Sequence, residues 1–189
     1  MNKDLLRKED KMIVILADDK KEKMGKALYE YYKAKNEEVE FVSVSDLDIK
    51  PCYACQGCTY KTYGKCVFRD DMDNIVHLLM EGDVIIYTSP VLWGGFSYSI
   101  KKVIDKMALT GSRFYKVKNG EIVKGSISNM KKLVGIGVSD RASDKERKTF
   151  ENLLKEMGII TDTKYMGKVT DTLFTHDDVE KIAKEVYEL

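Results

Sequence analysis

Residues 12–17 read Met-Ile-Val-Ile-Leu-Ala, a continuous apolar run rich in β-branched side chains. Such a run is typical of a strand that is covered on both faces, as in a parallel sheet. Similar runs occur at residues 83–88 and 133–138, and two further strands are predicted at 39–44 and within 159–169. Between the strands, apolar residues recur at spacings of three and four, which predicts helices over residues 21–35, 70–81, 97–107, 143–157 and 176–187.

The ends of these segments support the assignment. Asp70 or Asp71 suits the N-cap of the second helix, while Gly82 and Gly158 are predicted to end the second and fourth helices. Strands that alternate with helices imply parallel βαβ units with right-handed crossovers. Five such strands fit the flavodoxin-like order 2-1-3-4-5. We therefore predict an α/β fold with three αβα layers.

One stretch departs from the alternation of strands and helices. Residues 113–124 contain Asn119-Gly120 between two short alternating runs, which is a strong signal for a β-hairpin. We predict an extra hairpin here, between the third helix and the fourth strand. Because no low-complexity linker or internal repeat interrupts the pattern, residues 1–189 are expected to form a single domain.

Composition narrows the class of function. The 189 residues include 32 basic and 31 acidic side chains, so the net charge of +1 argues against a nucleic-acid partner bound by bulk charge. The sequence contains no run of 18 apolar residues, so no membrane span is predicted. Residues 1–11 are charged and lack the apolar core of a signal peptide. We expect a cytoplasmic protein, in which thiols stay reduced.

The predicted fold directs the search for a site to the carboxyl ends of the strands, where open parallel sheets bind ligands. The loop after the third strand supplies apolar surface and flexible backbone suited to a flat ring system. Its candidate binding residues are Ser89, Pro90, Val91, Leu92, Trp93 and Gly94. A hydrophobic plug or a subunit contact made by the sole tryptophan explains the same composition equally well.

Four cysteines form the second candidate site. Cys52, Cys55, Cys58 and Cys66 have the spacing C-x2-C-x2-C-x7-C. Three cysteines at steps of three with a fourth nearby can surround an iron–sulfur cluster, whereas zinc sites more often use two separated pairs. Redox-active or merely packed thiols are a third interpretation. We expect this loop to lead back towards the carboxyl edge of the sheet.

The loop after the first strand is the third candidate. Phosphate groups are bound where a Gly-, Ser- or Thr-rich turn enters a helix N-terminus, but residues 17–26 offer Asp18, Lys20 and Lys26 instead. The aspartates would repel a phosphate and the lysines would attract one. Taken alone, these residues favour a solvated charge run at the start of the helix. Ser139, after the fourth strand, either touches a ligand or caps the next helix.

Two segments together carry a resemblance to a known family. The cysteine segment continues to Asp70-Asp71-Met72, and the Ser-Pro-Val-Leu-Trp-Gly loop precedes residues 100–106, Ile-Lys-Lys-Val-Ile-Asp-Lys. This resembles the NADPH-dependent FMN reductase family of flavodoxin-like proteins, whose members carry PCxxCxxC…GxCxxxDDM, SPVYWG-like and LKxxIDR segments. The family includes members similar to iron–sulfur flavoproteins.

The resemblance implies a set of cofactors and partners. FMN would lie against Pro90 to Gly94 with Ser139 on its other side, NAD(P)H would be the co-substrate, and a small molecule would accept the electrons. In the iron–sulfur branch, the four cysteines bind a [4Fe-4S] cluster, and a ferredoxin-like partner donates electrons. Family members are usually homodimers or homotetramers.

The first loop departs from the family pattern. In the family, this loop normally reads GSPRxxGNT and contacts the FMN phosphate, whereas residues 17–25 of this chain contain no Ser or Thr. In the loop after the third strand, Leu92 stands where Tyr is common in the family. Three hypotheses follow. The chain is an FMN-dependent NAD(P)H oxidoreductase, an iron–sulfur flavoprotein that carries electrons, or a non-catalytic binding or assembly module with a degenerate phosphate loop.

Overall fold

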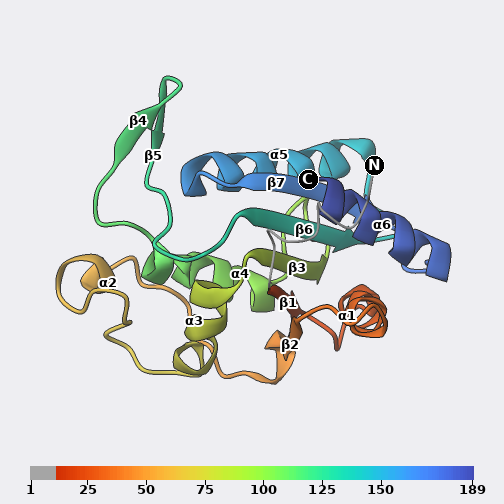
Figure 1. Ribbon diagram of the computed structural model, residues 1–189, viewed down its shortest axis with the longest axis horizontal. Coiled ribbons are helices and arrows are strands. Elements are labelled where there is room, and N and C mark those ends of the chain that lie inside the picture. Colours follow the sequence, from red (N-terminus) through yellow and green to blue (C-terminus); the bar gives the residue numbers. More distant parts are fainter. Residues whose placement is uncertain (1–11) are drawn as a thin grey trace.

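A parallel sheet of five strands forms the centre of the computed structural model, which describes residues 12–189 (Figure 1). Its order is β2-β1-β3-β6-β7, and every neighbouring pair is parallel. This confirms the predicted flavodoxin-like order, and the strands are β1 (Ile13–Ala17), β2 (Val39–Ser43), β3 (Val84–Pro90), β6 (Lys132–Val138) and β7 (Lys164–Thr170). The expectations about residues 1–11 lie outside the described part of the chain.

Helices cover both faces of the sheet, as the alternating pattern predicts. They are α1 (Met24–Ala34), α3 (Met72–Glu81), α4 (Tyr98–Lys106), α5 (Asp144–Thr161) and α6 (His176–Glu188). Side chains of β1 alternate between the two faces: Val14 and Leu16 pack with α3, α4 and α5, whereas Ile13 and Ile15 pack with α1 and α6. Burial of both faces explains why these strands read as continuous apolar runs.

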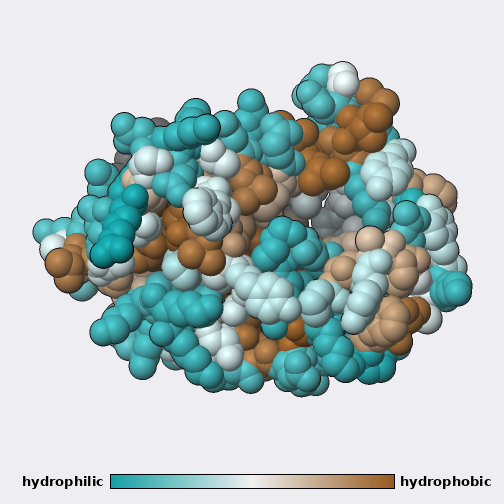
Figure 2. Space-filling model, turned by 180° about the vertical axis from the view of Figure 1, so that it is seen from behind, coloured by the Kyte–Doolittle hydropathy of each residue, from teal (hydrophilic) through white to brown (hydrophobic). Residues whose placement is uncertain are grey.

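The predicted hairpin is confirmed as β4 (Lys116–Lys118) and β5 (Glu121–Val123), which pair antiparallel. Asn119 and Gly120 have φ angles of 53° and 83°, the positive values that a type I′ turn requires. The hairpin projects from the body of the molecule (Figure 1). From behind, brown apolar side chains lie along it beside teal hydrophilic ones (Figure 2), and Phe114, Val117 and Ile122 are among the exposed apolar residues.

Three details differ from the sequence-based expectations. Gly158 does not end its helix, because α5 continues to Thr161. The glycine instead allows close packing, since a Cβ there would lie 2.4 Å from Cδ1 of Tyr165. The short helix α2 (Gly57–Tyr60) and the 3-10 turns at Val44–Asp46 and Met107–Thr110 were not predicted. Their few residues give no periodic signal.

Within residues 12–189, no helix combines the length and the apolar character needed to cross a membrane.

Candidate functional site

The loop after β3 is fixed to the sheet at both of its ends. The Ser97 N–H donates to Ser89 Oγ at 2.7 Å, and the Ser89 hydroxyl donates to the Pro90 carbonyl at 2.8 Å. The Val91 N–H donates to the Val138 carbonyl at 3.2 Å. Ser89 therefore connects the end of β3 to the start of α4, and its side chain has a structural role in this loop.

The tip of this loop is a tight turn that displays Trp93. Leu92 and Gly95 exchange two backbone hydrogen bonds of 2.9 Å, and between them Trp93 and Gly94 have φ angles of 56° and 76°. A bulky residue in the left-handed region is strained. Trp93 is also 93% exposed, so packing within the described chain does not offset this strain. The turn presents an aromatic face to whatever lies beyond it.

Two glycines hold the loop close to its neighbours. A Cβ at Gly94 would lie 2.8 Å from Cβ of Thr149 on α5, and a Cβ at Gly137 on β6 would lie 2.5 Å from Cγ2 of Val91. Non-bonded carbon atoms do not approach one another this closely. The Trp93 turn is therefore pressed against α5 and β6, which fixes its position.

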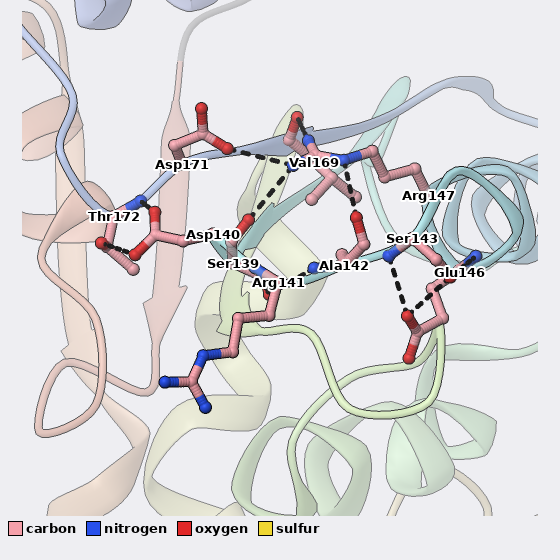
Figure 3. Close-up of polar contacts among 10 residues, drawn as sticks. All are labelled: Ser139, Asp140, Arg141, Ala142, Ser143, Glu146, Arg147, Val169, Asp171 and Thr172. Carbon is pink, nitrogen blue, oxygen red and sulfur yellow. Dashed lines mark hydrogen bonds and ion pairs between the residues drawn. The ribbon is translucent and has the colours of Figure 1, made fainter.

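Ser139 begins the second loop at this edge of the sheet (Figure 3). Its Oγ accepts hydrogen bonds from the N–H groups of Arg141 and Ala142 at 3.2 and 3.1 Å. Asp140 accepts from the backbone N–H of Thr172 at 2.6 Å and from its hydroxyl, and these hydrogen bonds lower the pKa of Asp140. Both side chains shape the loop. The Arg141 side chain points away from this network (Figure 3).

Arg147 ties this loop to the end of β7, a role that the sequence analysis missed (Figure 3). Its guanidinium donates to the carbonyls of Ser139, Ala142 and Val169 at 3.1–3.3 Å and pairs with Asp171 at 3.0 Å. The planar fork of arginine donors suits such a multiple contact. An isolated arginine inside a helix gives no sequence signal for it.

The loop after β1 contains a buried acid at the start of α1. Glu22 is only 5% exposed. Its carboxylate accepts from the Gly25 N–H at 3.1 Å and from the Thr88 hydroxyl at 2.6 Å. Burial raises the pKa of Glu22 above its ordinary value, although the hydrogen bonds from Thr88 and Gly25 oppose the rise. No motif in the sequence indicates this role of Glu22.

Asp18 is fully buried at the end of β1. Its Oδ1 accepts from the Ser45 hydroxyl at 2.5 Å, and the Lys21 ammonium lies 3.4 Å from its Oδ2. Burial acts to raise the pKa of Asp18, but Ser45, the neighbouring Ser97 hydroxyl and Lys21 lower it below the ordinary value. Asp18 Oδ2 and Ser97 Oγ nevertheless have no partner in hydrogen-bond geometry.

The lysines of this loop do not form a shared cationic patch. Lys20 pairs with Asp46 at 2.6 Å and also donates to the Ser45 carbonyl at 3.3 Å. Lys21 pairs with Asp18, while Lys26 is exposed on α1. The first two charges are thus directed to neighbouring carboxylates of the same chain.

The four cysteines are all free thiols on one loop. Cys52 and Cys55 are exposed, whereas Cys58, on α2, and Cys66 are partly buried against the core. A Cβ added to Gly57 would lie 3.5 Å from Sγ of Cys55. Within residues 12–189, the side chains whose possible metal-ligand atoms lie within 4.8 Å of one another are those of His176, Asp177 and Glu180. No cysteine belongs to this group.

Asp70 closes the base of the cysteine loop. Its carboxylate forms a buried ion pair with Lys106 at the end of α4, and it accepts from the N–H groups of Lys50 and Met72 at 2.8 and 3.1 Å. Asp71 accepts from the Asp48 N–H at 2.7 Å. Burial raises the pKa of Asp70, but the Lys106 ammonium and the two N–H groups outweigh it and lower the pKa. The two aspartates thus join both ends of the loop.

These contacts join the base of the cysteine loop, between the turn after β2 and the start of α3. The loop lies against the end of α4 and the turn after it, where Arg113 stacks on the Tyr63 ring at 4.0 Å. The Trp93 turn instead precedes the start of α4. Nine residues of α-helix rise about 13 Å. The base of the cysteine loop is therefore tied to the end of α4, whereas the Trp93 turn precedes the start of this helix.

Comparison with known proteins gives one family match. The sequence model of the NADPH-dependent FMN reductase family matches residues 11–153. This range covers the sheet through β6 and includes the Trp93 turn, the loop after β1 and the cysteine loop.

Individual relatives match over shorter stretches. An iron–sulfur flavoprotein of Methanocaldococcus jannaschii is 42% identical over 69 residues, which cover 36% of this chain and 35% of the relative. An iron–sulfur flavoprotein of Methanosarcina thermophila is 32% identical over 98 residues, which cover 52% and 50% of the two chains. The chain therefore spans half or less of the length of these relatives. Among solved structures, a flavone reductase superposes with a TM-score of 0.58 at 12% identity, covering 94% of this chain and 62% of that one, which supports the fold alone.

Proposed function

Because the chain belongs to the NADPH-dependent FMN reductase family, we propose that it is a flavin-dependent oxidoreductase. The observation that carries this proposal is the Trp93 turn. It lies after β3, the strand beside β1 at the centre of the sheet, and it holds an exposed aromatic side chain in a strained conformation. Strained residues cluster at functional sites, and the carboxyl edge of an open parallel sheet is where ligands bind.

The residues of the chain fit the ring of a flavin better than its phosphate. Leu92 and Trp93 expose apolar surface suited to a flat ring, Pro90 and Val91 are half-buried beside them, and the Ser139–Arg141 loop follows β6, the neighbour of β3. At the start of α1, however, Glu22 already accepts the hydrogen bonds from Gly25 and Thr88. The phosphate of FMN does not fit there. Redox chemistry belongs to the flavin, while this chain contributes binding and orientation.

We propose NAD(P)H as the electron donor, a small molecule as the acceptor and the cytoplasm as the setting. The test is to purify the protein, record its visible spectrum, and follow NAD(P)H oxidation with riboflavin or FMN added. Bound flavin and flavin-dependent oxidation are expected. A colourless protein that binds neither flavin at roughly tens of micromolar would contradict the proposal, and it would favour a non-catalytic binding module.

A second candidate function is electron transfer through a [4Fe-4S] cluster, which the names of the two relatives favour. Four free thiols on one loop are the donor set that such a cluster uses. The residues that would hold it are Cys52, Cys55, Cys58 and Cys66, and a ferredoxin-like protein is the proposed donor. Iron and sulfide analysis after anaerobic purification tests this.

The cluster proposal has a matched pair of variants on the short helix α2. Cys58→Ser should remove the iron, whereas Thr59→Ser, at the next position, should retain it. Iron and sulfide absent from the wild-type protein after anaerobic purification would reject the cluster.

A homodimer or homotetramer is part of the same proposal. The exposed apolar side chains of the β4–β5 hairpin (Figure 2) offer a surface for a second copy. The molar mass in solution, measured by light scattering, tests this for the wild type and for Ile122→Lys. A wild-type mass equal to that of one 21.6 kDa chain would contradict it.

A further inference from the structure

We propose that Glu22 fills the anion site at the N-terminus of α1, so that this chain selects a flavin without a phosphate, such as riboflavin. The choice of riboflavin as ligand rests on the proposed function. The exclusion of phosphate from the start of α1 does not, because it follows from the contacts of Glu22 alone.

The hydrogen bonds of Glu22 are those that a bound anion would use. A helix N-terminus attracts anions because its first N–H groups lack partners and its dipole is positive there. Here the Gly25 N–H, in the first turn of α1, donates to Glu22 Oε2 at 3.1 Å, and the Thr88 hydroxyl of β3 donates to Oε1 at 2.6 Å. The chain thus places its own carboxyl oxygens at this position.

Space at the start of α1 is already taken. A Cβ at Gly25 would lie 2.4 Å from Thr88 Oγ1, 2.7 Å from the Ala17 Cβ and 3.2 Å from Glu22 Oε1. The first turn of the helix therefore rests directly on β1 and β3, with the Glu22 carboxylate beside it. A phosphate can approach the Gly25 N–H only if the Glu22 side chain leaves.

The charges around the site also oppose a phosphate. Asp18 is fully buried nearby with a lowered pKa, so it carries a negative charge at neutral pH. Asp19 adds to the raised pKa of Glu22, which places a further carboxylate within electrostatic reach. Lys20 and Lys21 are paired with Asp46 and Asp18. A second anion here would meet like charges in a poorly solvated position.

Two buried polar atoms indicate what the edge accepts instead. Asp18 Oδ2 and Ser97 Oγ are buried without a partner in hydrogen-bond geometry. The Lys21 ammonium lies 3.4 Å from Asp18 Oδ2, and the Ser97 hydroxyl lowers the pKa of Asp18, so electrostatic attraction partly compensates these buried groups. The carboxylate can still accept a further hydrogen bond, and the hydroxyl groups of a polyol are donors whereas an ionised phosphate is an acceptor. Riboflavin ends in such hydroxyls, and FMN ends in the phosphate.

Two variants of Glu22 separate charge and bulk. Glu22→Ala removes the carboxylate and frees the Gly25 N–H. Glu22→Gln keeps the shape, and its amide can still accept from Gly25 while donating to the Thr88 hydroxyl. Binding of inorganic phosphate, measured by calorimetry, should be absent in the wild type and in Glu22→Gln. Glu22→Ala should bind phosphate at least about tenfold more tightly, the effect of one charge-assisted hydrogen bond.

Flavin titrations of the same three proteins complete the test. The wild type should bind riboflavin at least as tightly as FMN, and Glu22→Ala should shift the preference towards FMN by about tenfold or more. Phosphate binding by the wild type, or a clear wild-type preference for FMN, would overturn the inference even if Glu22→Ala does not fold. If the wild type binds neither flavin, the proposed function fails, and phosphate binding alone decides the role of Glu22.

Discussion

Replacing Trp93 by glycine should stabilise the protein while weakening flavin binding. Trp93 has a φ of 56° and is 93% exposed, so its removal uncovers no core. The left-handed conformation costs a residue with a side chain about 1–2 kcal/mol, and the added freedom of glycine in the unfolded chain costs about 0.5–1 kcal/mol. The net gain is therefore between about 0 and 1.5 kcal/mol, which in a chain of this size raises Tm by up to about 5 °C.

The assay is urea unfolding followed by far-UV circular dichroism, together with riboflavin binding by calorimetry. Trp93→Ala is the matched control, because it removes the ring but keeps the left-handed strain. It should lose flavin affinity equally and stay within about 0.5 kcal/mol of the wild type. If Trp93→Gly is less stable than the wild type by more than about 1 kcal/mol, or if its flavin affinity is unchanged, the reasoning about a strained ligand-binding turn is wrong.

Three further predictions concern the supports of the two candidate sites. Lys106→Met removes the cation that pairs with the buried Asp70 carboxylate and should lower the free energy of unfolding, measured with urea, by about 3–5 kcal/mol. Unchanged stability would refute the importance of this buried ion pair. Gly137→Ala should lower the free energy of unfolding by about 1–3 kcal/mol, because the added Cβ would lie 2.5 Å from Cγ2 of Val91. Gly95→Ala is the control, because its Cβ would have its nearest contact at 3.5 Å, and it should leave the stability nearly unchanged. Because the pKa of Asp70 is lowered on folding, its stabilisation is present above the unfolded pKa of about 3.9 and is lost as the pH falls through the folded value. Asp70→Asn should therefore flatten the acid side of the stability profile, and an unchanged slope would count against this.

Local sequence patterns were sufficient to predict the fold. Continuous apolar runs such as residues 12–17 identify strands buried on both faces, and Asn119-Gly120 identifies the hairpin. These signals depend on neighbouring residues, so they survive without knowledge of the tertiary structure. The prediction that Gly158 ends its helix was wrong because the role of this glycine depends on tertiary packing. Its role is to make room for Tyr165, a residue on the next strand, and a helix interior tolerates glycine when packing favours it.

The candidate site could be predicted only in part. The Trp93 turn was found because its composition is unusual, but its strain and exposure required coordinates. Glu22 was overlooked within a run of charges that reads as solvent-exposed. One of its hydrogen bonds comes from Thr88, which lies 66 residues further along the chain. Arg147 and the Asp70–Lys106 pair were missed likewise, because long-range polar contacts leave no periodic pattern in a single sequence.

The central claim, that the turn after β3 binds the ring of a flavin, can be tested by the fluorescence of Trp93. The chain contains one tryptophan, so its emission reports on this turn alone. Titration of the wild type with riboflavin should give saturable quenching beyond that of free N-acetyltryptophanamide in the same solutions. Emission that follows the free tryptophan derivative up to roughly tens of micromolar riboflavin would contradict the claim.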